Sequence, residues 1–384
     1  MHLFFFGSHP KFSKLEVDSL VSDSVYIGNV GALANCDEKT AMQAFQKSGG
    51  IPKFGKVIAD IQSTDIQELE KVIAKTLADT QTKKYILSFY TNRFSFPQIG
   101  RLIVSLKQVA HRPKFMGKFN KKVQSPATVF HLLKKGGAEI NVIEVGNSLL
   151  VVQTTQVQDA NYWTLVDFEK PHREKHVGML PSKLARMMVN ISNPQPNTYI
   201  WDPFCGLGTV LMQCELLNIP SVGSDVSGQA MTFTEENLQW LQQKGLVPEL
   251  QSETFIYDIK YPRLPDEIRP LSISAVVTEP FLGKMRSRPF DNMRDAIHEW
   301  EREVKPLIKS LLQAAYHVLP AGGMLVYVKP VYSYIDNKRV KWYNPRVEFD
   351  AKKWQQLIPS DGSYIWNNEE GTILKELGLL MKHK

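Results

Sequence analysis

The sequence contains little cysteine. Three cysteines occur in 384 residues: Cys36, Cys205 and Cys214. No two of them form a CxxC pair, and an odd, scattered set argues against both a disulfide framework and a zinc site. Such usage is typical of a reducing compartment. The nine histidines are dispersed along the chain, and we expect no metal site.

Long apolar runs are also missing. No stretch of about 18 apolar residues occurs, and the opening MHLFFFG has no Lys or Arg before its apolar residues. A membrane span and a secretory signal are therefore not expected, and we interpret the first residues as a buried strand in a cytoplasmic protein. A hydrophobic share of 43% and a charged share of 22% are typical of globular proteins. At this length we expect two or three domains.

Acidic residues are missing from one long stretch. Residues 80–138 contain twelve Lys or Arg and no Asp or Glu. The other residues hold 34 basic and 39 acidic side chains, so they are net negative although the whole chain is net +7. Positive charge confined to one region is typical of proteins that bind a polyanion such as nucleic acid. The alternative is an ordinary solvated basic surface.

Strand and helix signals divide the chain into four parts. We predict an α/β region at 1–55, a second α/β unit at 56–158, a connector at 159–177 and a C-terminal domain at 178–384. The second unit includes two strand-like runs joined at Gly146-Asn147, a plausible hairpin. From residue 178, helix and strand patterns alternate as in a doubly wound α/β sheet.

A glycine-bearing turn lies inside the C-terminal domain. Residues 198–211 read TYIWDPFCGLGTVL, an apolar strand that ends at an acid and leads through a turn into an apolar helix. Gly206 and Gly208 allow a close approach of backbone to ligand, and the helix N-terminus presents free N–H groups. Leu211 stands where the dinucleotide fingerprint has its third glycine, which disfavours an NAD-linked oxidoreductase.

Two further acids end the next two predicted strands, PSVGSD and TFIYD. A carboxylate at the tip of the second strand, Asp225, suits the two hydroxyls of a ribose, and Asp258 suits the edge of an adenine. Three acids at successive strand ends predict an adenosine-type cofactor. The alternative is that Asp225 and Asp258 only cap helices.

Several segments resemble one enzyme family. DPFCGLGT resembles the cofactor motif of RNA amino-methyltransferases, and HVGMLPSKLARMMVNIS resembles the segment before it in THUMP-containing tRNA guanosine-N2 methyltransferases. FFFGSHPKFSKLEVDSL is similar to the first strand and helix of those enzymes, and SPATVFHLLKKGGAEINVI to the end of their THUMP domain. GSDVSGQAMTFTEENLQWL resembles the second strand and following helix of their catalytic domain.

The resemblance implies a layout and a reaction. It implies a ferredoxin-like region at 1–55, an RNA-binding THUMP domain at 56–158 and a Rossmann-like class I methyltransferase domain at 178–384. S-adenosylmethionine is the implied cofactor, and the exocyclic N2 amine of a tRNA guanosine is the implied target. By position, the implied cofactor-binding residues are Gly178, Met179, Leu180, Pro181, Asp202, Phe204, Gly206, Gly208, Asp225 and Asp258.

The catalytic motif departs from the family pattern. Those enzymes carry Asp or Asn, then Pro-Pro, then Tyr or Phe after the fourth strand, where this chain has Thr278-Glu279-Pro280-Phe281. The Thr278 hydroxyl is a weak acceptor for an amine that develops positive charge. Glu279 supplies a carboxylate only if a turn aims it inward, because neighbouring strand residues point oppositely. Phe281 keeps an aromatic platform for a flipped base, unless it is a core residue.

The leading hypothesis is a tRNA methyltransferase that takes tRNA as its partner. The basic region supplies the candidate RNA-binding residues, which are Arg101, Lys107, Arg112, Lys114, Lys118, Lys121 and Lys122. The first alternative is a catalytically impaired tRNA-binding protein that keeps the cofactor pocket. The second is an amino-methyltransferase for another RNA or DNA base. The sequence favours a monomer or loose dimer and leaves a small activator subunit open.

Overall fold

The computed structural model describes residues 1–63, 65–80, 82–108, 112–118, 122–173, 179–261, 263–366 and 371–383. The chain divides into two compact units, Met1–Tyr162 and Trp163–Lys384, which are described separately. Within the described part of the chain, each helix is too short or too polar to span a bilayer.

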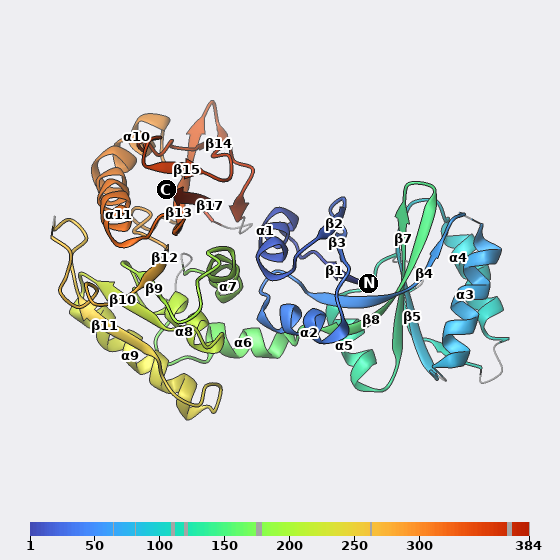
Figure 1. Cartoon of the computed structure of the whole chain (residues 1–384). Helices are drawn as coiled ribbons and strands as arrows, with labels where there is room; N and C mark the ends of the chain where they lie inside the picture. Colours follow the sequence, from blue (N-terminus) through green and yellow to red (C-terminus); the bar gives the residue numbers. More distant parts are fainter. Residues whose placement is uncertain are drawn as a thin grey trace. The chain divides into compact units, whose positions relative to one another are not determined.

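The first unit is built on one eight-stranded sheet with the order β2-β3-β1-β4-β8-β7-β5-β6. Its strands are β1 (His2–Phe5), β2 (Ser24–Ile27), β3 (Gly31–Ala34), β4 (Lys53–Ile61), β5 (Lys84–Tyr90), β6 (Lys114–Phe115), β7 (Ala138–Val145) and β8 (Ser148–Val157). β5 pairs in parallel with both β6 and β7. β4 runs across the predicted boundary between residues 55 and 56, so the first two predicted domains share this sheet (Figure 1).

Five helices pack on the sheet in the described part of the first unit. They are α1 (Pro10–Leu20), α2 (Glu38–Lys47), α3 (Ile66–Asp79), α4 (Phe96–Leu106) and α5 (Pro126–Lys134). α1 and α2 pack on the strands around β1, whereas α3 and α4 pack on β5, β7 and β8. The hairpin predicted at Gly146-Asn147 is confirmed, because Val145 pairs with Ser148 across a two-residue loop. A further helix, α6 (Ala160–Phe168), lies in the segment predicted as a connector.

The second unit has a nine-stranded sheet with the main order β11-β10-β9-β12-β13-β17-β15. Its strands are β9 (Tyr199–Asp202), β10 (Ser221–Asp225), β11 (Ser252–Ile256), β12 (Ile273–Thr278), β13 (Met324–Asp336), β14 (Arg339–Tyr343), β15 (Trp354–Gln356), β16 (Ile365–Trp366) and β17 (Ile373–Lys382). From β11 to β13 all neighbours are parallel, and β17 is antiparallel to β13. This confirms the doubly wound α/β arrangement.

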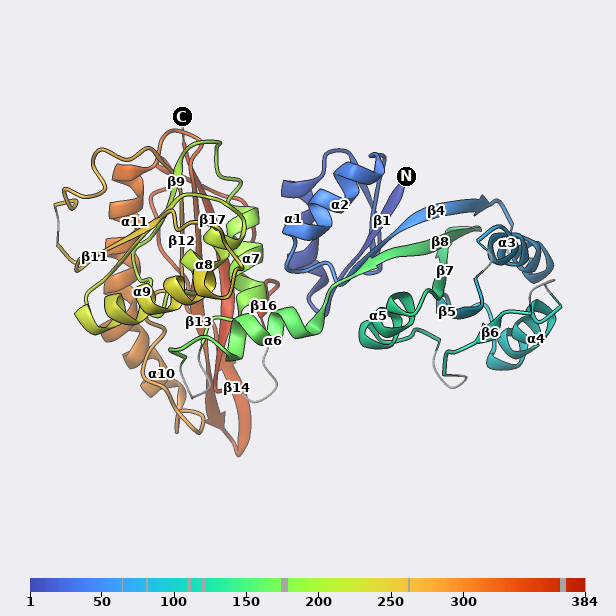
Figure 2. The ribbon, with the colours of Figure 1, turned by 90° about the horizontal axis from the view of Figure 1, so that it is seen from below.

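Helices cover both faces of this second sheet. They are α7 (Ser182–Ile191), α8 (Thr209–Leu216), α9 (Gly228–Gln243), α10 (Met293–Glu299), the π-helical turn η1 (Trp300–Val304) and α11 (Lys305–Val318). Figure 2 shows α8 and α9 on one side of the sheet and α11 on the other. Ile308 and Leu311 of α11 belong to the same buried core as Trp201 of β9. The strand order reverses between β9 and β12, which makes a topological switch point there.

Candidate active site

A cavity of about 880 Å³ opens at the switch point. Its walls come from the turn after β9, the ends of β10 and β11, the turn after β12 and the start of β17. The carboxyl ends of parallel strands at a switch point are where sheets of this class bind ligands. The cavity is therefore the candidate active site.

The turn after β9 forms the floor of this cavity. Asp202 ends the strand, and Gly206 and Gly208 both have left-handed backbone, with φ of +53° and +77°. A Cβ added at Gly208 would lie 2.8 Å from the Thr234 side chain, whereas one at Gly206 would meet nothing nearer than 3.9 Å. Gly208 therefore serves close packing of the turn on α9, and Gly206 leaves open space beside the cavity.

Asp202 is a buried carboxyl without a basic partner among the described residues. Its Oδ1 accepts hydrogen bonds from the Thr278 hydroxyl at 2.6 Å and from the Phe204 backbone N–H at 3.1 Å. Burial raises the pKa of Asp202 to about 7, against the opposing effect of these two donors. The negative charges of Asp225 and Glu279 also raise it. A cation that enters the cavity would therefore stabilise the ionised form of the Asp202 carboxyl.

Asp225 and Asp258 line the same cavity from the neighbouring strands. Asp225 accepts from the backbone N–H of Gly206 at 3.1 Å on one oxygen and of Ser227 at 3.0 Å on the other. Each oxygen keeps a lone pair for a hydroxyl donor. The cap of α9 is Ser227, whose side chain accepts from the Ala230 N–H. Asp225 therefore does not serve as the helix cap that the alternative interpretation required.

The turn after β12 brings Glu279, Pro280 and Phe281 to the cavity. The Phe281 ring is 44% exposed, so it is not a core aromatic. Two hydrogen bonds hold the end of this turn: the Tyr332 hydroxyl donates to the Leu282 carbonyl at 2.9 Å, and the Lys284 N–H donates to Glu299 Oε1 at 2.7 Å. The turn is thereby fixed on β13 and α10.

Lys375 is a cavity residue that the sequence reasoning missed. Its Nζ forms an ion pair with Glu279 Oε1, and both side chains line the cavity. Lys375 lies on β17, which joins the sheet beside β13, so its contact with Glu279 depends on strand pairing far along the chain. No local sequence motif predicts such a pairing.

The predicted site residues divide into those that line the cavity and those that do not. Ten line it: Met179, Leu180, Asp202, Phe204, Gly206, Asp225, Asp258, Glu279, Pro280 and Phe281. Three do not: Pro181, Gly208 and Thr278. Thr278 is fully buried, and its hydroxyl is engaged with Asp202 rather than directed into the cavity. Gly178 lies outside the described residues.

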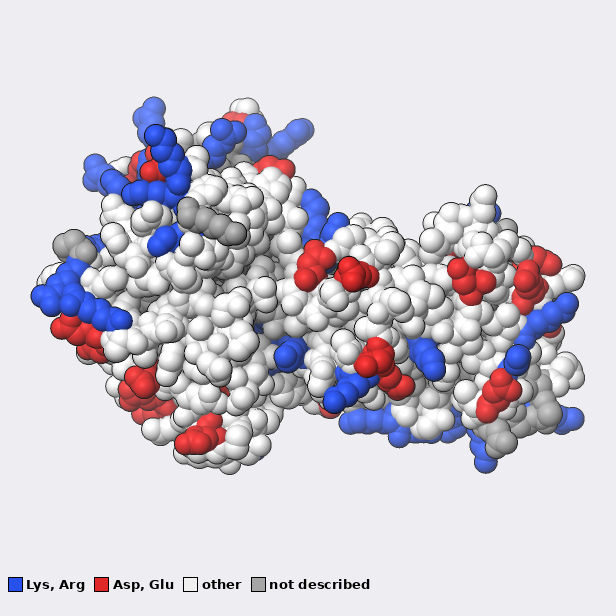
Figure 3. Space-filling model, viewed as in Figure 1, with Lys and Arg blue, Asp and Glu red and all other residues white. Residues whose placement is uncertain are grey.

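The predicted RNA-binding cations belong to the first unit. Those that are exposed are Arg101, Lys107, Arg112, Lys114 and Lys118. None of these five forms an ion pair with a described residue, whereas Lys122 is half-buried and donates to the Thr91 carbonyl at 3.4 Å. Lys121 lies outside the described residues. Figure 3 shows Lys and Arg side chains gathered along one edge of this unit, where few acidic side chains are visible.

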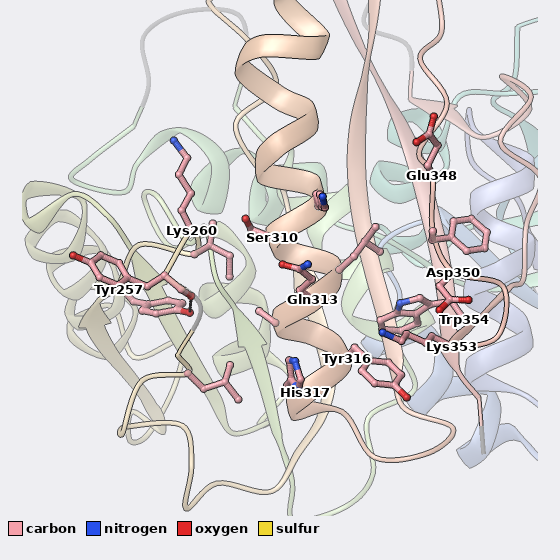
Figure 4. Close-up of a pocket in the computed structure, with 17 residues that line it drawn as sticks. Tyr257, Lys260, Ser310, Gln313, Tyr316, His317, Glu348, Asp350, Lys353 and Trp354 are labelled. Atoms are coloured by element: carbon pink, nitrogen blue, oxygen red, sulfur yellow. Dashed lines mark hydrogen bonds between the residues drawn. The ribbon is translucent and has the colours of Figure 1, made fainter.

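A second, smaller cavity of about 520 Å³ lies along α11. Figure 4 shows Tyr257 and Lys260 on one side of this helix and Lys353 and Trp354 on the other. None of the residues predicted for the active site lines it. Among the described residues, no three His, Cys, Asp or Glu side chains are grouped as a metal ion would require.

Comparisons with known sequences agree with the family resemblance. A family model described as DNA methylase (N6_N4_Mtase) matches residues 57–236. The tRNA (guanine(10)-N2)-dimethyltransferase of Methanothermobacter thermautotrophicus is 29% identical over 190 residues, which cover 49% of this chain and 50% of that enzyme. The enzyme of the same name from Methanocaldococcus jannaschii is 27% identical over 201 residues, 52% of this chain and 51% of its own. The chain thus spans about half the length of the curated relatives it matches.

A solved structure extends the likeness in fold to the whole chain. TrmN from Thermus thermophilus aligns with a TM-score of 0.55 at 13% identity and covers 100% of both chains. At this identity the likeness concerns the fold alone. The predicted resemblance to tRNA guanine-N2 methyltransferases is confirmed by the relatives' sequences, and the predicted α/β fold is confirmed by the structure.

Proposed function

We propose that this chain is an S-adenosylmethionine-dependent methyltransferase that acts on the exocyclic N2 amine of a guanosine in tRNA. One observation carries the proposal. A single cavity at the switch point is lined both by the acids suited to an adenosyl cofactor and by Glu279-Pro280-Phe281. The names of the curated relatives support the choice of guanine in tRNA over other bases.

The residues of the cavity fit the cofactor. Asp225 keeps a free lone pair on each oxygen for the ribose hydroxyls, and Asp258 lies on the next strand for the adenine edge. Met179 and Leu180 line the cavity and suit the methionine portion. S-adenosylmethionine, when bound, supplies a methyl group carried on a positively charged sulfur. The buried Asp202 carboxyl becomes a stronger acceptor, and more fully ionised, when a positive charge shares the cavity.

Glu279 and its neighbours suit the amine of the target base. The N2 lone pair of guanine is delocalised into the ring, so acceptors around its N–H bonds favour the pyramidal geometry that attack on a methyl group needs. The Glu279 carboxylate and the carbonyl of Pro280 are such acceptors. The exposed Phe281 ring gives a flipped base a face on which to stack. Lys375 pairs with Glu279 Oε1, and both side chains line the cavity, so the ion pair holds the carboxylate at the proposed position of the amine.

In this proposal the first unit binds the tRNA. Its exposed cations suit sequence-independent contacts with phosphates. We keep the predicted division into a ferredoxin-like region at 1–55, a THUMP domain at 56–158, a connector at 159–177 and a methyltransferase domain at 178–384. Acting on tRNA, the protein works in the cytoplasm, as a monomer or loose dimer.

One observation favours a second candidate function. Because Lys375 forms an ion pair with Glu279, the Glu279 carboxylate is a poorer acceptor for a developing cation than a carboxylate without a cationic partner. A tRNA-binding protein that keeps the cofactor cavity but lacks amine activation is the alternative. The matching family model, described as DNA methylase, favours a test of DNA bases as well.

Methyl transfer from labelled S-adenosylmethionine to separate pools of tRNA, rRNA and DNA tests the proposal. We expect label in tRNA alone, released on digestion as an N2-methylated guanosine. Glu279→Gln removes the negative charge and should lower kcat roughly 100-fold. Its matched control is Glu301→Gln, because Glu301 is paired with Lys305 at 3.0 Å on the surface and does not line the cavity.

Each outcome separates the candidates. If Glu279→Gln methylates tRNA as fast as wild type, the acid-assisted mechanism is wrong. If wild type binds tRNA and cofactor but transfers no label to any pool, the chain is the non-catalytic tRNA-binding protein. If label appears in DNA or rRNA alone, the substrate is a base of that nucleic acid and not a guanosine in tRNA.

A further inference from the structure

Three cations follow the catalytic turn, and the structure separates one of them from the others. Lys284 and Arg288 are exposed and do not line the cavity, whereas Arg286 is half-buried and does. The Arg286 guanidinium lies over the ring of Phe290, 3.9 Å from the centroid, and that ring is 3% exposed. A guanidinium stacked on a buried aromatic loses little conformational freedom when it binds a partner.

The backbone around Arg286 is fixed at both ends of the stack. The Arg286 carbonyl accepts from the Thr372 hydroxyl at 2.9 Å, which ties it to the segment before β17. Phe290 exchanges two backbone hydrogen bonds with β13, donating to Ser333 and accepting from Ile335, both at 2.9 Å. The cation is therefore held in position before any ligand arrives.

Among the described residues, the Nε of Arg286 has no acceptor, although this atom is buried. A buried donor without a partner costs free energy, so a structural role limited to the stack on Phe290 leaves this atom unexplained. Arg286 also lines the cavity, so its guanidinium is the donor group through which this residue can bind an anion there.

The charges of the cavity show why an anionic substrate needs this cation. Among the described residues, five acids line the cavity: Asp202, Asp225, Asp258, Glu279 and Glu303. Of the lining cations, Lys375 is paired with Glu279, and Lys260 lies two residues from Asp258, at the proposed cofactor end. Arg286 is the lining cation that follows the catalytic turn, which puts it beside the proposed position of the base.

We propose that Arg286 binds a backbone phosphate of the RNA nucleotide whose base enters the cavity, through the paired N–H groups of its guanidinium. A planar fork of donors matches phosphate oxygens, and the stack on Phe290 orients it. The contact would set the depth to which the nucleotide enters, and so position its amine at Glu279. This inference rests on the proposed function. The carboxylate of the cofactor is the other anion within reach of the same cavity, and the test below distinguishes the two.

Arg286→Gln and Arg286→Lys test the proposal in the full chain, with Arg288→Gln as the matched control. With a tRNA transcript, we expect Arg286→Gln to raise KM about tenfold and to change kcat less than twofold. The slope of log(kcat/KM) against log salt should fall in magnitude by about one, because one phosphate contact is lost. Arg286→Lys keeps the charge without the fork and should recover part of the loss. Arg288→Gln should behave as wild type.

Three results would overturn the proposal. An unchanged KM and salt slope in Arg286→Gln excludes a phosphate contact. Weaker binding of S-adenosylhomocysteine in calorimetry assigns the guanidinium to the cofactor carboxylate instead. A lower unfolding midpoint with an unchanged KM assigns it to packing on Phe290. If wild type transfers no methyl group, the proposed function fails separately, and Arg286 is then judged by the affinity of tRNA and its salt slope in filter binding.

Discussion

Two lysine–glutamate pairs, one inside the sheet of the first unit and one at the cavity of the second, differ in access. The second unit also contains a sealed pair, Lys329–Glu376, whose side chains are 1% and 0% exposed. In the first unit Lys53 lies 2.7 Å from Glu139, and their side chains are 4% and 0% exposed. Ser88 and Thr154 donate to the two Glu139 oxygens at 2.6 and 2.5 Å, which closes the network. In the second unit the Lys375–Glu279 pair is 7% and 16% exposed and lines the cavity. A sealed pair serves the fold, whereas an open pair is available for chemistry.

The largest expected effect concerns the sealed pair of the first unit. Lys53→Met leaves the Glu139 carboxylate buried without its cation, and removing one partner of a buried pair costs about 3 to 5 kcal/mol. Chemical denaturation should show this loss of stability, while cofactor affinity of the folded protein stays as in wild type. A loss below about 1 kcal/mol would show that the network tolerates an unpaired acid. The claim that the sealed Lys53–Glu139 pair stabilises the fold would then be wrong.

Asp202 extends the comparison to a buried carboxyl with no cation among the described residues. Its folded pKa of about 7 lies above its ordinary value of 3.8, so the folded state binds a proton that the unfolded state has released. The stability that this provides is complete at low pH and is lost as pH rises from about 4 to 7. Wild type should lose about 2 to 3 kcal/mol relative to Asp202→Asn between pH 5 and pH 8. Parallel stability curves for the two proteins would contradict the assignment.

Breaking the Lys375–Glu279 pair should lower kcat more than it lowers the free energy of unfolding. Lys375→Met frees Glu279 from its fixed position, and misplacement of a reacting group lowers kcat on the order of 10- to 100-fold. Glu279 can turn toward water in the cavity, so the unfolding free energy should fall less than in Lys53→Met. Lys375→Arg should restore part of kcat. A rise in kcat for Lys375→Met would mean that Lys375 suppresses Glu279 rather than positioning it.

Much of the site follows from local sequence. The strand that ends at Asp202, the glycine turn and the acids after β10 and β11 are consecutive signals within a doubly wound pattern, and the structure brings them to one cavity. Glu279 was identified with the condition that a turn aim it inward, and the turn after β12 does so. These features were predictable because each depends on a few neighbouring residues.

The remainder depends on contacts between distant parts of the chain. Lys375 reaches Glu279 only because β17 pairs with β13. Arg286 differs from Lys284 and Arg288 in its stack on Phe290, its partial burial and its place in the cavity wall. Thr278 was expected in the catalytic group, yet its hydroxyl faces Asp202 across neighbouring strands. Strand β4 in the first unit likewise runs across residue 55, where strand and helix signals had placed a domain boundary.

The smallest expected effect concerns Thr278. Thr278→Val keeps the shape of the side chain and removes the hydroxyl donor that lowers the pKa of Asp202. The pKa of that carboxyl should therefore rise further, and the loss of stability between pH 5 and pH 8 should grow by about 1 kcal/mol. Denaturation curves at the two pH values measure the change. An unaltered difference would indicate that Thr278 does not hold the Asp202 carboxylate.

Calorimetric titration with S-adenosylhomocysteine examines the cofactor cavity itself. We expect saturable binding to wild type, weakened more than about tenfold by Asp225→Ala, which removes two carboxylate acceptors for the ribose. Asp350→Ala is the control, because Asp350 accepts from the Lys352 N–H at 2.9 Å in a similar turn but lines the second cavity along α11. It should bind as wild type does. No detectable binding to wild type, or a loss in Asp350→Ala in place of Asp225→Ala, would contradict the account.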